Sequence, residues 1–376
     1  MSGFTMPWPV EPIRITTGDL NRLLASASEQ GVSDVFLWSG NPVSVSLHGS
    51  VTRVGNRDLS EQEMLQLLNE ISRNGGTAVQ SGRDFDFRYE VHRPDMKGFY
   101  RFRVNITQTM SGPSATFRSI TDLPPPLSAL DVEPELERLL FFSKGLGLIT
   151  GPTGSGKTTL LAAVLRYRLE TEPINLLTFE APIEFVFYGL PGMKGIVSQS
   201  EIPMHLPDFA AAVRGSLRRA PKVVLVGEAR DKETIFGMVN EVRTGHAVYS
   251  TSHTESVAGT LDRLIHEFPP EEAQRAKMAI IDSLQVIVHQ RLVPSVDGKR
   301  VAIREWLGFD ADLREEINRI PIEHLTAEMA RMVADRGRGL AESARLAMNE
   351  GKISALIYQE VLASIGEGKR ESTTPA

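Results

Sequence analysis

The hydrophobic residues in the first third of the chain recur at every second position in several places. Residues 43–47 alternate between apolar residues and serine, and residues 34–38 form a second short apolar run. Both patterns predict strands, and His48-Gly49-Ser50 after residue 47 predicts a hairpin turn. Residues 85–89 and 99–105 alternate in the same way, so we expect two further antiparallel strands there.

A helical spacing of apolar positions replaces this alternation over residues 60–72. Ser60 is the predicted N-cap, and Glu63 stands three residues later, which is the spacing of a capping box. The strands and this helix together predict a first domain of mixed α+β character over residues 1–120.

The rest of the chain divides into a linker and two further regions. The consecutive prolines Pro124–Pro126 hold the chain extended and predict a linker over residues 121–127. Residues 128–310 alternate short apolar strands with helical patterns, which is typical of an α/β domain with a parallel sheet covered by helices. Residues 311–376 are predicted to be a helical carboxy-terminal region, with a disordered polar tail from Gly366.

The composition is that of an ordinary soluble protein, with 41% hydrophobic and 23% charged residues. The absence of cysteine excludes disulfides, thiolate metal sites and a cysteine nucleophile. The net charge of −6 argues against a broad nucleic-acid surface, because phosphate contacts need clustered Lys and Arg. Neither a membrane-spanning apolar run nor a secretory signal is evident, so we expect a cytoplasmic protein.

A glycine-rich segment joins a strand pattern at residues 146–150 to a helical pattern that starts near Leu160. It fits Gly-x-x-x-x-Gly-Lys-[Ser/Thr], the loop whose backbone N–H groups surround nucleotide phosphates. The nine residues are Gly151, Pro152, Thr153, Gly154, Ser155, Gly156, Lys157, Thr158 and Thr159. The alternative is a glycine turn without a ligand, but the strand and helix around the loop favour an anion site. We therefore expect a bound nucleoside triphosphate, with Lys157 at its β- and γ-phosphates and the Thr158 hydroxyl on Mg²⁺.

Two further apolar strand patterns end in a carboxylate. Residues 174–179 lead to Glu180, which could orient or deprotonate an attacking water, or could instead cap or pair locally. The residues themselves leave these alternatives open. Residues 223–226 lead through Gly227 to Glu228, which is predicted to help hold the magnesium beside the loop. The alternative is a buried strand with a solvated terminal acid.

A histidine stands on each side of a strand pattern near residue 250. These are His246 and His253, and a lone histidine is more often structural than catalytic. A metal site built on them is not expected, because the chain offers neither thiolates nor a nearby third histidine.

In this order and at this spacing, the segments resemble the ATPases of type II and type IV secretion systems and the pilus-retraction motors. The similarity to the family's Walker A, Asp box, Walker B and His box motifs lies in residues 151–159, 178–184, 226–231 and 244–254. Residues 34–37, 101–105 and 117–118 resemble its amino-terminal domain, and residues 281–294, with Gln290-Arg291-Leu292, resemble its core end. Within the family, the chain looks most like the ATPases of type IVB secretion and conjugal plasmid transfer.

The resemblance implies a PAS-like amino-terminal α+β domain followed by a RecA-like P-loop ATPase domain, with ATP held between them, in a ring of six subunits. It also implies a role for several residues of the Asp box, Walker B and His box motifs. Glu180 matches the catalytic base, Glu228 the Walker B acid that shares Mg²⁺ with Thr158, and His253 a sensor near the γ-phosphate. His246 and Glu184 lie in the same boxes and are further catalytic candidates.

The resemblance also covers two arginines of the first domain. Arg103 and Arg118 match residues that the family's amino-terminal domain directs toward the phosphates. An arginine that neutralises transition-state charge is worth about 10³–10⁵ in rate. The alternative is a pair of surface arginines bound to acids such as Asp84 or Asp86.

Two positions depart from the family pattern. The Asp box normally reads Glu-Asp-Pro, and here its middle residue is Ala181, which can neither accept a proton nor bind magnesium-bound water. Whatever the aspartate does is absent here or is done by Glu180 or Glu184. Lys222 stands where the family usually has an acid before the Walker B strand.

The expected function is therefore an ATP-hydrolysing motor for secretion, conjugal transfer or pilus dynamics, with ATP and Mg²⁺ as cofactors. Its expected partners are further copies of itself and proteins of an inner-membrane secretion or transfer apparatus, which would hold it at the cytoplasmic face of the bacterial inner membrane. No direct contact with nucleic acid is expected. The alternatives are a nucleic-acid motor of the RecA or helicase class, which needs a basic, aromatic-laced loop, and a non-hydrolysing regulator switched by nucleotide.

Overall fold

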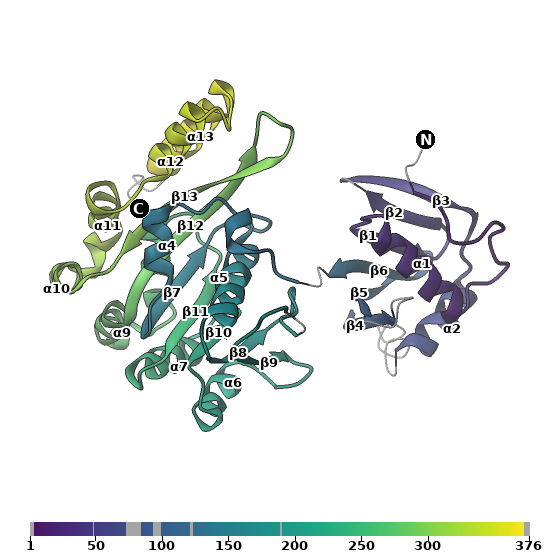
Figure 1. Ribbon diagram of the computed structural model, residues 1–376, viewed down its shortest axis with the longest axis horizontal. Helices are drawn as coiled ribbons and strands as arrows, with labels where there is room; N and C mark the ends of the chain where they lie inside the picture. The colour runs from purple at the N-terminus through teal and green to yellow at the C-terminus, as the bar shows by residue number, and fades with distance from the viewer. Residues whose placement is uncertain are drawn as a thin grey trace. The chain divides into compact units, whose positions relative to one another are not determined.

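The computed structural model describes residues 4–47, 49–72, 84–92, 99–120, 123–188 and 190–371. The chain forms two compact units, residues 1–122 with Glu184–Val186, and residues 123–183 with 187–376. Each unit has its own β-sheet (Figure 1).

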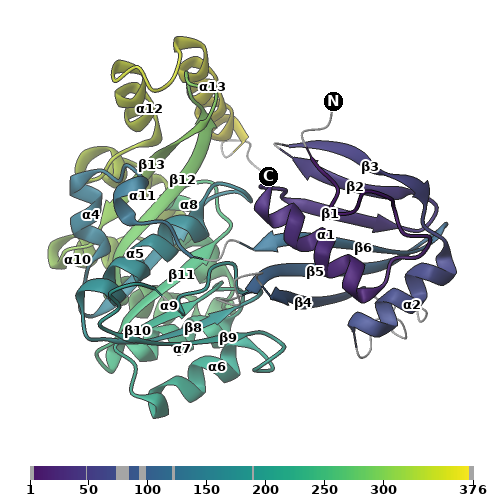
Figure 2. The ribbon, with the colours of Figure 1, turned by 45° about the vertical axis from the view of Figure 1, so that its right-hand side comes forward.

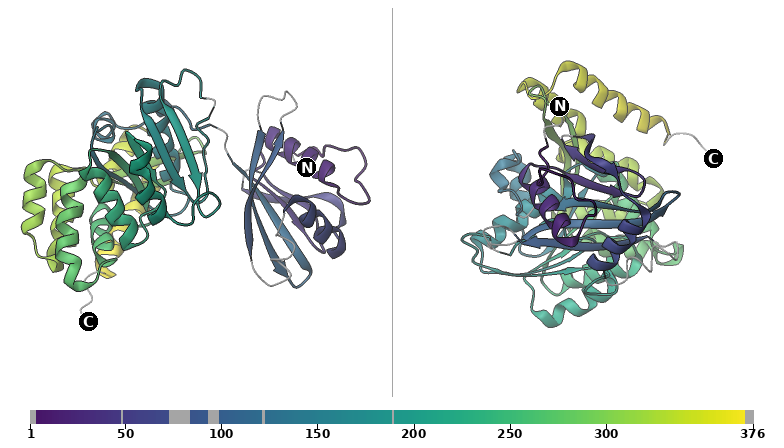
Figure 3. Two further views of the ribbon diagram at one scale, coloured as in Figure 1. Left: turned by 90° about the horizontal axis from the view of Figure 1, so that it is seen from below. Right: turned by 90° about the vertical axis from the view of Figure 1, so that its right-hand side faces the viewer.

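The first unit is built on a six-stranded antiparallel sheet with the order β3-β2-β1-β6-β5-β4. Its strands are β1 (Asp34–Trp38), β2 (Pro42–Leu47), β3 (Ser50–Asp58), β4 (Phe85–His92), β5 (Phe99–Thr109) and β6 (Gly112–Ile120). Helices α1 (Thr17–Glu29) and α2 (Glu61–Ile71) lie on one face of this sheet (Figures 2 and 3). The four strands predicted from alternation are confirmed. The predicted turn joins β2 to β3, although His48 itself lies outside the described residues.

The two helices of the first unit begin with different caps. Thr16 and Asp19 form a reciprocal capping box at α1, a helix that was not predicted although Leu20, Leu23, Leu24 and Ala27 have helical spacing. At α2 the Ser60 side chain accepts the Glu63 backbone N–H, as predicted. The predicted capping box is nevertheless only half formed, because the Glu63 carboxylate instead accepts hydrogen bonds from Arg57 and the Ile15 backbone.

The second unit contains a seven-stranded sheet with the order β13-β12-β7-β11-β10-β8-β9. Its strands are β7 (Gly145–Thr150), β8 (Asn175–Glu180), β9 (Ile196–Glu201), β10 (Val223–Val226), β11 (Ala247–Ser252), β12 (Leu284–Pro294) and β13 (Arg300–Gly308). Neighbouring strands from β9 to β12 are parallel, and β13 extends the sheet antiparallel to β12. The predicted parallel sheet is therefore confirmed.

Helices cover both faces of the second sheet. Successive residues of a strand point to opposite faces, so each buried strand contributes side chains to the cores on both sides. Leu148 of β7 belongs to the large core shared with α6 to α11, and the next residue, Ile149, is buried outside that core. Helix α5 contacts β7 and β11, which α7 also contacts. The helices are α4 (Pro134–Leu140), α5 (Lys157–Thr171), α6 (Phe209–Ser216), α7 (Lys232–Arg243), α8 (Val257–His266), α9 (Pro270–Ser283), α10 (Ala311–Arg319), α11 (Ile322–Arg336), α12 (Leu340–Asn349) and α13 (Ala355–Glu371), with 3-10 turns η1 (Leu127–Ala129) and η2 (Leu217–Arg219).

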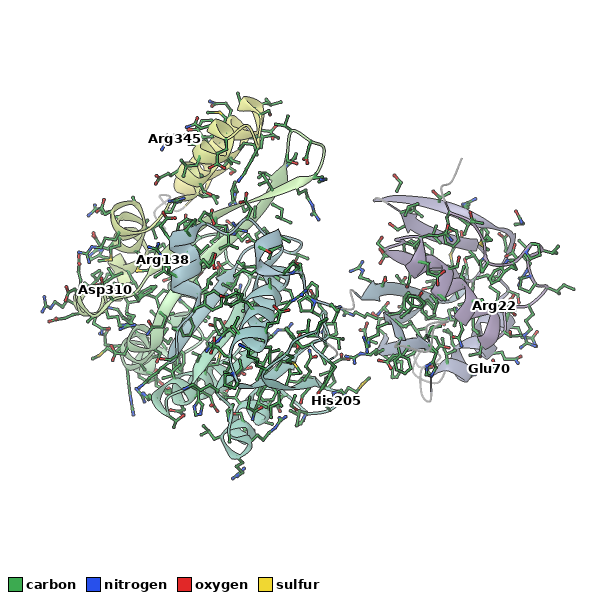
Figure 4. All side chains as sticks on the ribbon, in the orientation of Figure 1. Arg22, Glu70, Arg138, His205, Asp310 and Arg345 are labelled. Carbon is green, nitrogen blue, oxygen red and sulfur yellow. The ribbon has the colours of Figure 1, made fainter. Side chains whose placement is uncertain are left out.

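The carboxy-terminal region is helical, as predicted. Asp310, labelled in Figure 4, caps α10 by accepting the Leu313 backbone N–H at 2.8 Å. Helices α12 and α13 share a small hydrophobic cluster with Ile303 of β13. The prediction of a disordered tail from Gly366 is wrong as far as Glu371, because α13 continues to that residue, and residues 372–376 lie outside the described part. Within the described ranges, no helix is long and apolar enough to cross a bilayer.

Candidate functional site

The parallel strands of the second unit bring the predicted motifs to one edge of the sheet. Ser252 of β11 is paired with Thr150 of β7, and Val226 of β10 with Phe179 of β8. The glycine-rich loop, His253, Glu228 and Glu180 therefore all follow or end strands at the same carboxyl edge. This is the edge at which open α/β sheets bind ligands.

The loop of residues 151–156 uses glycine where another side chain would not fit. A Cβ atom at Gly151, whose φ is 141°, would lie 2.3 Å from the carbonyl oxygen of Gln290. Gly156 has a φ of 79° and is the residue from which α5 starts. The first amide groups of α5 thus follow directly on the loop, as in an anion site.

Lys157 lies buried under the loop that precedes it. Its Nζ donates hydrogen bonds to the carbonyl oxygens of Gly151 at 2.6 Å and Pro152 at 2.9 Å. The hydroxyl oxygen of Ser155 is also buried and makes no hydrogen bond within the described residues. A buried ammonium and a buried hydroxyl beside open amides are suited to an anion with several oxygens, such as a polyphosphate.

Glu228 follows β10 after a close approach between two strands. The Gly227 N–H donates to the carbonyl of Phe179 at 2.7 Å, and a Cβ at Gly227 would lie 3.0 Å from that oxygen. One carboxylate oxygen of Glu228 accepts a hydrogen bond from Arg230 Nε at 2.6 Å. The carboxylate of Glu228 and the hydroxyl of Thr158 are oxygen ligands of the kind that Mg²⁺ prefers, so these residue types fit the metal.

Glu180 ends β8 and is buried. Its Oε1 accepts hydrogen bonds from Thr178 Oγ1 at 2.6 Å and from Gln199 Nε2 at 3.3 Å. Both features expected from the sequence are therefore present, since the acid lies at the carboxyl edge and also pairs locally. Glu184 is exposed four residues later.

The two histidines of the predicted His box lie at opposite ends of β11. His253 follows the strand at the carboxyl edge, where partial desolvation of its ring and then the Lys157 ammonium lower its pKa. His246 precedes the strand at the amino edge, about 20 Å away along β11. There it contacts Thr244 and Glu241. The expectation that His246 joins the site is wrong within this chain, because a strand separates the two positions.

Three buried residues of the β12–β13 hairpin were missed as site residues. His289 is paired with Thr150, the last residue before the loop, and Gln290 Nε2 donates to the Ser155 carbonyl at 2.7 Å. Arg304 of β13 in turn donates to Gln290 Oε1 at 2.8 Å. His289 and Gln290 stand near the end of an apolar run in the sequence. Polar residues within a predicted buried strand were the feature that could have identified them as site residues.

A cavity of about 420 Å³ borders the outer side of the loop. It is lined by the loop, by the end of β12 and by α13, and Arg291 Nη1 donates to Ser364 Oγ at 3.0 Å across one side. The carboxy-terminal helices, which the sequence left without a role, therefore adjoin the candidate site.

Arg103 and Arg118 belong to the first unit, where they are paired with each other across β5 and β6. Arg118 Nε donates to Asp34 at 2.8 Å, and Arg103 Nε lies 3.6 Å from Asp86 Oδ1. Both guanidinium groups are largely exposed in these pairs. The alternative of surface arginines bound to acids thus describes their contacts within the unit, with Asp86 as one of the two acids expected.

A parallel α/β sheet in which a buried interior strand runs into Gly-x-x-x-x-Gly-Lys-Thr and then a helix defines a P-loop nucleotide-binding domain. The family described as "Type II/IV secretion system protein" matches residues 15–320, and the chain belongs to this family. It is 36% identical over 293 residues to the type IV pilus retraction ATPase PilT of Pseudomonas aeruginosa, covering 76% of this chain and 81% of PilT. It is 32% identical over 349 residues to a twitching motility protein of Neisseria gonorrhoeae, covering 92% and 91%.

Solved structures give the same result over nearly the whole chain. The Legionella pneumophila ATPase DotB is 37% identical and superposes with a TM-score of 0.82, covering 95% of this chain and 98% of DotB. The pilus retraction motor PilT with bound ADP is 28% identical, with a TM-score of 0.81 over 93% of this chain and 97% of PilT. The protein is therefore an ATP-binding ATPase of the family that serves secretion systems and type IV pili.

Proposed function

We propose that this chain is a motor subunit that hydrolyses ATP to power a type IV secretion, conjugal transfer or pilus machine. The observation that carries the proposal is the set of groups at the carboxyl edge of the second sheet, where Lys157 and Ser155 lie buried within the loop and Glu180, Glu228 and His253 end the neighbouring strands. The proposed form is a homo-hexamer that meets membrane proteins of its machine at the inner face of the bacterial inner membrane. The names of its relatives, a retraction motor and secretion ATPases, support this choice of machine.

The proposed fold assignment follows from the same relatives. We take the first unit as a PAS-like domain over residues 1–120 and the sheet of the second as a RecA-like ATPase domain over residues 128–310. Residues 121–127 would be the linker and residues 311–376 a helical extension. The antiparallel sheet covered on one face and the parallel sheet covered on both faces support these assignments.

Each residue of the carboxyl edge has a proposed part in hydrolysis. Lys157 exchanges its bonds to Gly151 and Pro152 for the β- and γ-phosphate oxygens. Thr158 and Glu228 hold Mg²⁺, which when bound neutralises charge on the β- and γ-phosphates. Arg230 pairs with one carboxylate oxygen of Glu228, which leaves the other oxygen for the metal.

Glu180 is the proposed catalytic base that orients the attacking water. Its Oε1 is held by Thr178 and Gln199, so the carboxylate has a defined orientation at the end of β8. Ala181 has no group that could replace it. His253 is proposed to respond to the γ-phosphate. Its lowered pKa keeps the ring neutral near pH 7, so one ring nitrogen can accept and the other donate a hydrogen bond.

Steady-state phosphate release tests the proposed function. Wild-type turnover should depend on Mg²⁺ and on ATP, and it should fall to background in Lys157→Ala and in Glu228→Gln. Arg336→Gln is a matched surface control, since Arg336 pairs with Glu316 on the outside of the helical region. Turnover that persists in both site variants would reject the assignment of the site.

A nucleotide-switched regulator is the second candidate, and Ala181 is the observation that favours it. A departure from the Asp-box pattern beside the proposed base is compatible with binding that is not followed by hydrolysis. Tight ATP binding by the wild-type protein, without phosphate release even in the presence of its membrane partners, would favour the regulator over the motor.

A further inference from the structure

We propose that Gln290 is a positioning residue of the phosphate loop and that Arg304 ties it to the segment of residues 130–133. This inference rests on the proposed nucleotide site and deepens it, because it names the residues that hold the loop in its phosphate-binding shape. Both residues lie on the β12–β13 hairpin, outside the sequence motifs of the loop itself.

Gln290 touches the loop at both of its ends. Its Nε2 donates to the Ser155 carbonyl at 2.7 Å, and its side-chain nitrogen would lie 3.0 Å from a Cβ at Gly156. Its backbone carbonyl would lie 2.3 Å from a Cβ at Gly151. Gln290 is only 3% exposed, so the loop contacts a buried residue.

The hydrogen bond to Ser155 sets the direction of a neighbouring N–H group. In a trans peptide the C=O and the N–H point to opposite sides of the chain. Because Gln290 holds the carbonyl of Ser155, the N–H of Gly156 in the same peptide points away from Gln290. We place that N–H on the phosphate side of the loop, where amide groups supply the binding energy for the anion.

Arg304 determines which way the Gln290 amide faces. A guanidinium group can only donate hydrogen bonds, so the Gln290 atom 2.8 Å from Arg304 Nε must be the amide oxygen. This leaves the amide nitrogen for the Ser155 carbonyl, which can only accept. The two residues are paired in the register of β12 and β13, so the orientation is built into the hairpin.

The rest of the Arg304 guanidinium binds the segment that follows η1. Its Nη2 donates to the Leu130 carbonyl at 3.0 Å, and its Nη1 donates to the Asp131 carbonyl at 3.1 Å and to Glu133 Oε2 at 2.9 Å. The Arg304 side chain itself is buried, with 2% of the residue exposed, and its acceptors in residues 130–133 are partly exposed. A continuous path of hydrogen bonds therefore runs from the phosphate loop through the buried side chains of Gln290 and Arg304 to residues 130–133, the segment that follows η1.

Through this path, a change in the conformation of the phosphate loop affects residues 130–133, and a change in residues 130–133 affects the loop. A change of the loop on phosphate binding that moves the Ser155 carbonyl must move or break a buried bond, because an unsatisfied amide or guanidinium is costly there. Coupling between two sites is reciprocal, so the state of residues 130–133 must also affect nucleotide affinity.

The test compares ADP binding by the full chain in two conservative variants. Gln290→Glu keeps the size of the side chain and its contact with Arg304 but cannot donate to Ser155, and Arg304→Lys keeps the charge but cannot bridge three acceptors. We expect each variant to bind ADP about ten-fold more weakly, or worse, by calorimetry below the melting temperature. Arg314→Met is the matched control, because Arg314 also makes two hydrogen bonds to β12, at the Leu284 carbonyl, but far from the loop.

Amide hydrogen exchange measured by mass spectrometry tests the connection to residues 130–133. In the wild type, ADP should slow exchange in peptides covering both the loop and residues 130–133. In Arg304→Lys, the slowing over residues 130–133 should be lost while some slowing over the loop remains. Equal slowing in the variant and the wild type would overturn the connection.

The outcomes separate this inference from the proposed function. Wild-type protein that fails to bind ADP rejects the nucleotide site itself. Wild-type binding together with unchanged affinity in Gln290→Glu and Arg304→Lys, and a melting temperature lowered only as in Arg314→Met, reduces the pair to a structural role and overturns the inference. Should Gln290→Glu fail to fold, Arg304→Lys alone decides the question by the same affinity measurement.

Discussion

The Nδ1 atom of the His289 ring lies 3.5 Å from Oγ1 of Thr150, the last residue before the phosphate loop. His289 is fully buried, and this burial, followed by the nearby Arg291 cation, lowers its pKa from 6.5 to about 4. The ring beneath the loop is therefore neutral at neutral pH. Lys157 supplies positive charge at the loop, and His289 adds none.

This pKa predicts how stability depends on pH. A histidine whose pKa is lower in the folded protein contributes stability that is complete above about pH 6.5 and is lost as the pH falls toward 4, because the unfolded chain binds the proton more tightly. At the acid end of this range, protonation of His289 lowers the free energy of unfolding by about 3 kcal/mol. Urea unfolding of the wild type and His289→Gln between pH 7.5 and 5 measures it. The difference in stability between them should shrink as the pH falls, and parallel curves would contradict the prediction.

Replacing Tyr249 by phenylalanine should destabilise the second unit by about 1–3 kcal/mol, the cost of leaving buried polar partners unsatisfied. The fully buried Tyr249 hydroxyl donates to the Leu140 carbonyl at 2.6 Å and accepts from Arg168 at 3.3 Å. Burial also raises its pKa to about 12, so the hydroxyl stays protonated. Tyr167→Phe, at a partly exposed ring, should change stability by less than about 0.5 kcal/mol. Equal effects of the two changes on the urea midpoint would refute this.

Adding one methyl group at Gly151 should weaken nucleotide binding more than ten-fold. The new Cβ would meet the Gln290 carbonyl at 2.3 Å, in a backbone conformation that other residues rarely adopt, so the loop has to move. Gly215→Ala is the control, since a Cβ there meets nothing within 4 Å and the residue lies in helix α6. Titration with ADP separates the two, and unchanged affinity in Gly151→Ala would show that the loop accommodates the group.

Arg103→Gln and Arg118→Gln should lower the turnover number by about 10³-fold or more if these guanidinium groups act on the phosphates as the family resemblance implies. Folding should be unaffected, because exposed ion pairs contribute about 0–1 kcal/mol. Arg53→Gln, at an exposed position of the same unit, serves as the control. Single-turnover hydrolysis with normal melting curves is the measurement. Rates equal to that of the control would assign both arginines to surface pairs with Asp34 and Asp86.

Local patterns were enough to predict the elements that carry the site. The run before Gly151, the glycine spacing and the apolar positions after Lys157 together specified a strand, a loop and a helix, and the structure contains β7, the loop and α5 in those places. The acids at 180 and 228 could be assigned to strand ends for the same reason. Each of these predictions depends on residues that are neighbours in sequence.

The residues that the sequence did not reveal act across long separations. Gln290 contacts Ser155 from 135 positions away, and Arg304 contacts Leu130 from 174 positions away. His246 was included because it lies in the same motif as His253, although it precedes β11 and so lies at the edge opposite the carboxyl ends of the strands. The half-formed capping box at Ser60 is a similar case, since Arg57 and the Ile15 backbone compete for Glu63.

Gln290 can hold the phosphate loop only when β12 and β13 pair in the correct register, because the pairing places Arg304 beside Gln290. Gln290 faces Arg304 only in the register observed, and the chain reverses through Ser295 and Lys299, beyond the end of β12. A slip by one residue would turn every side chain of a strand to the other face and present His289 or Arg291 to Arg304 instead. Insertions at this reversal are therefore compatible with nucleotide binding only when they leave the alignment of the two strands intact.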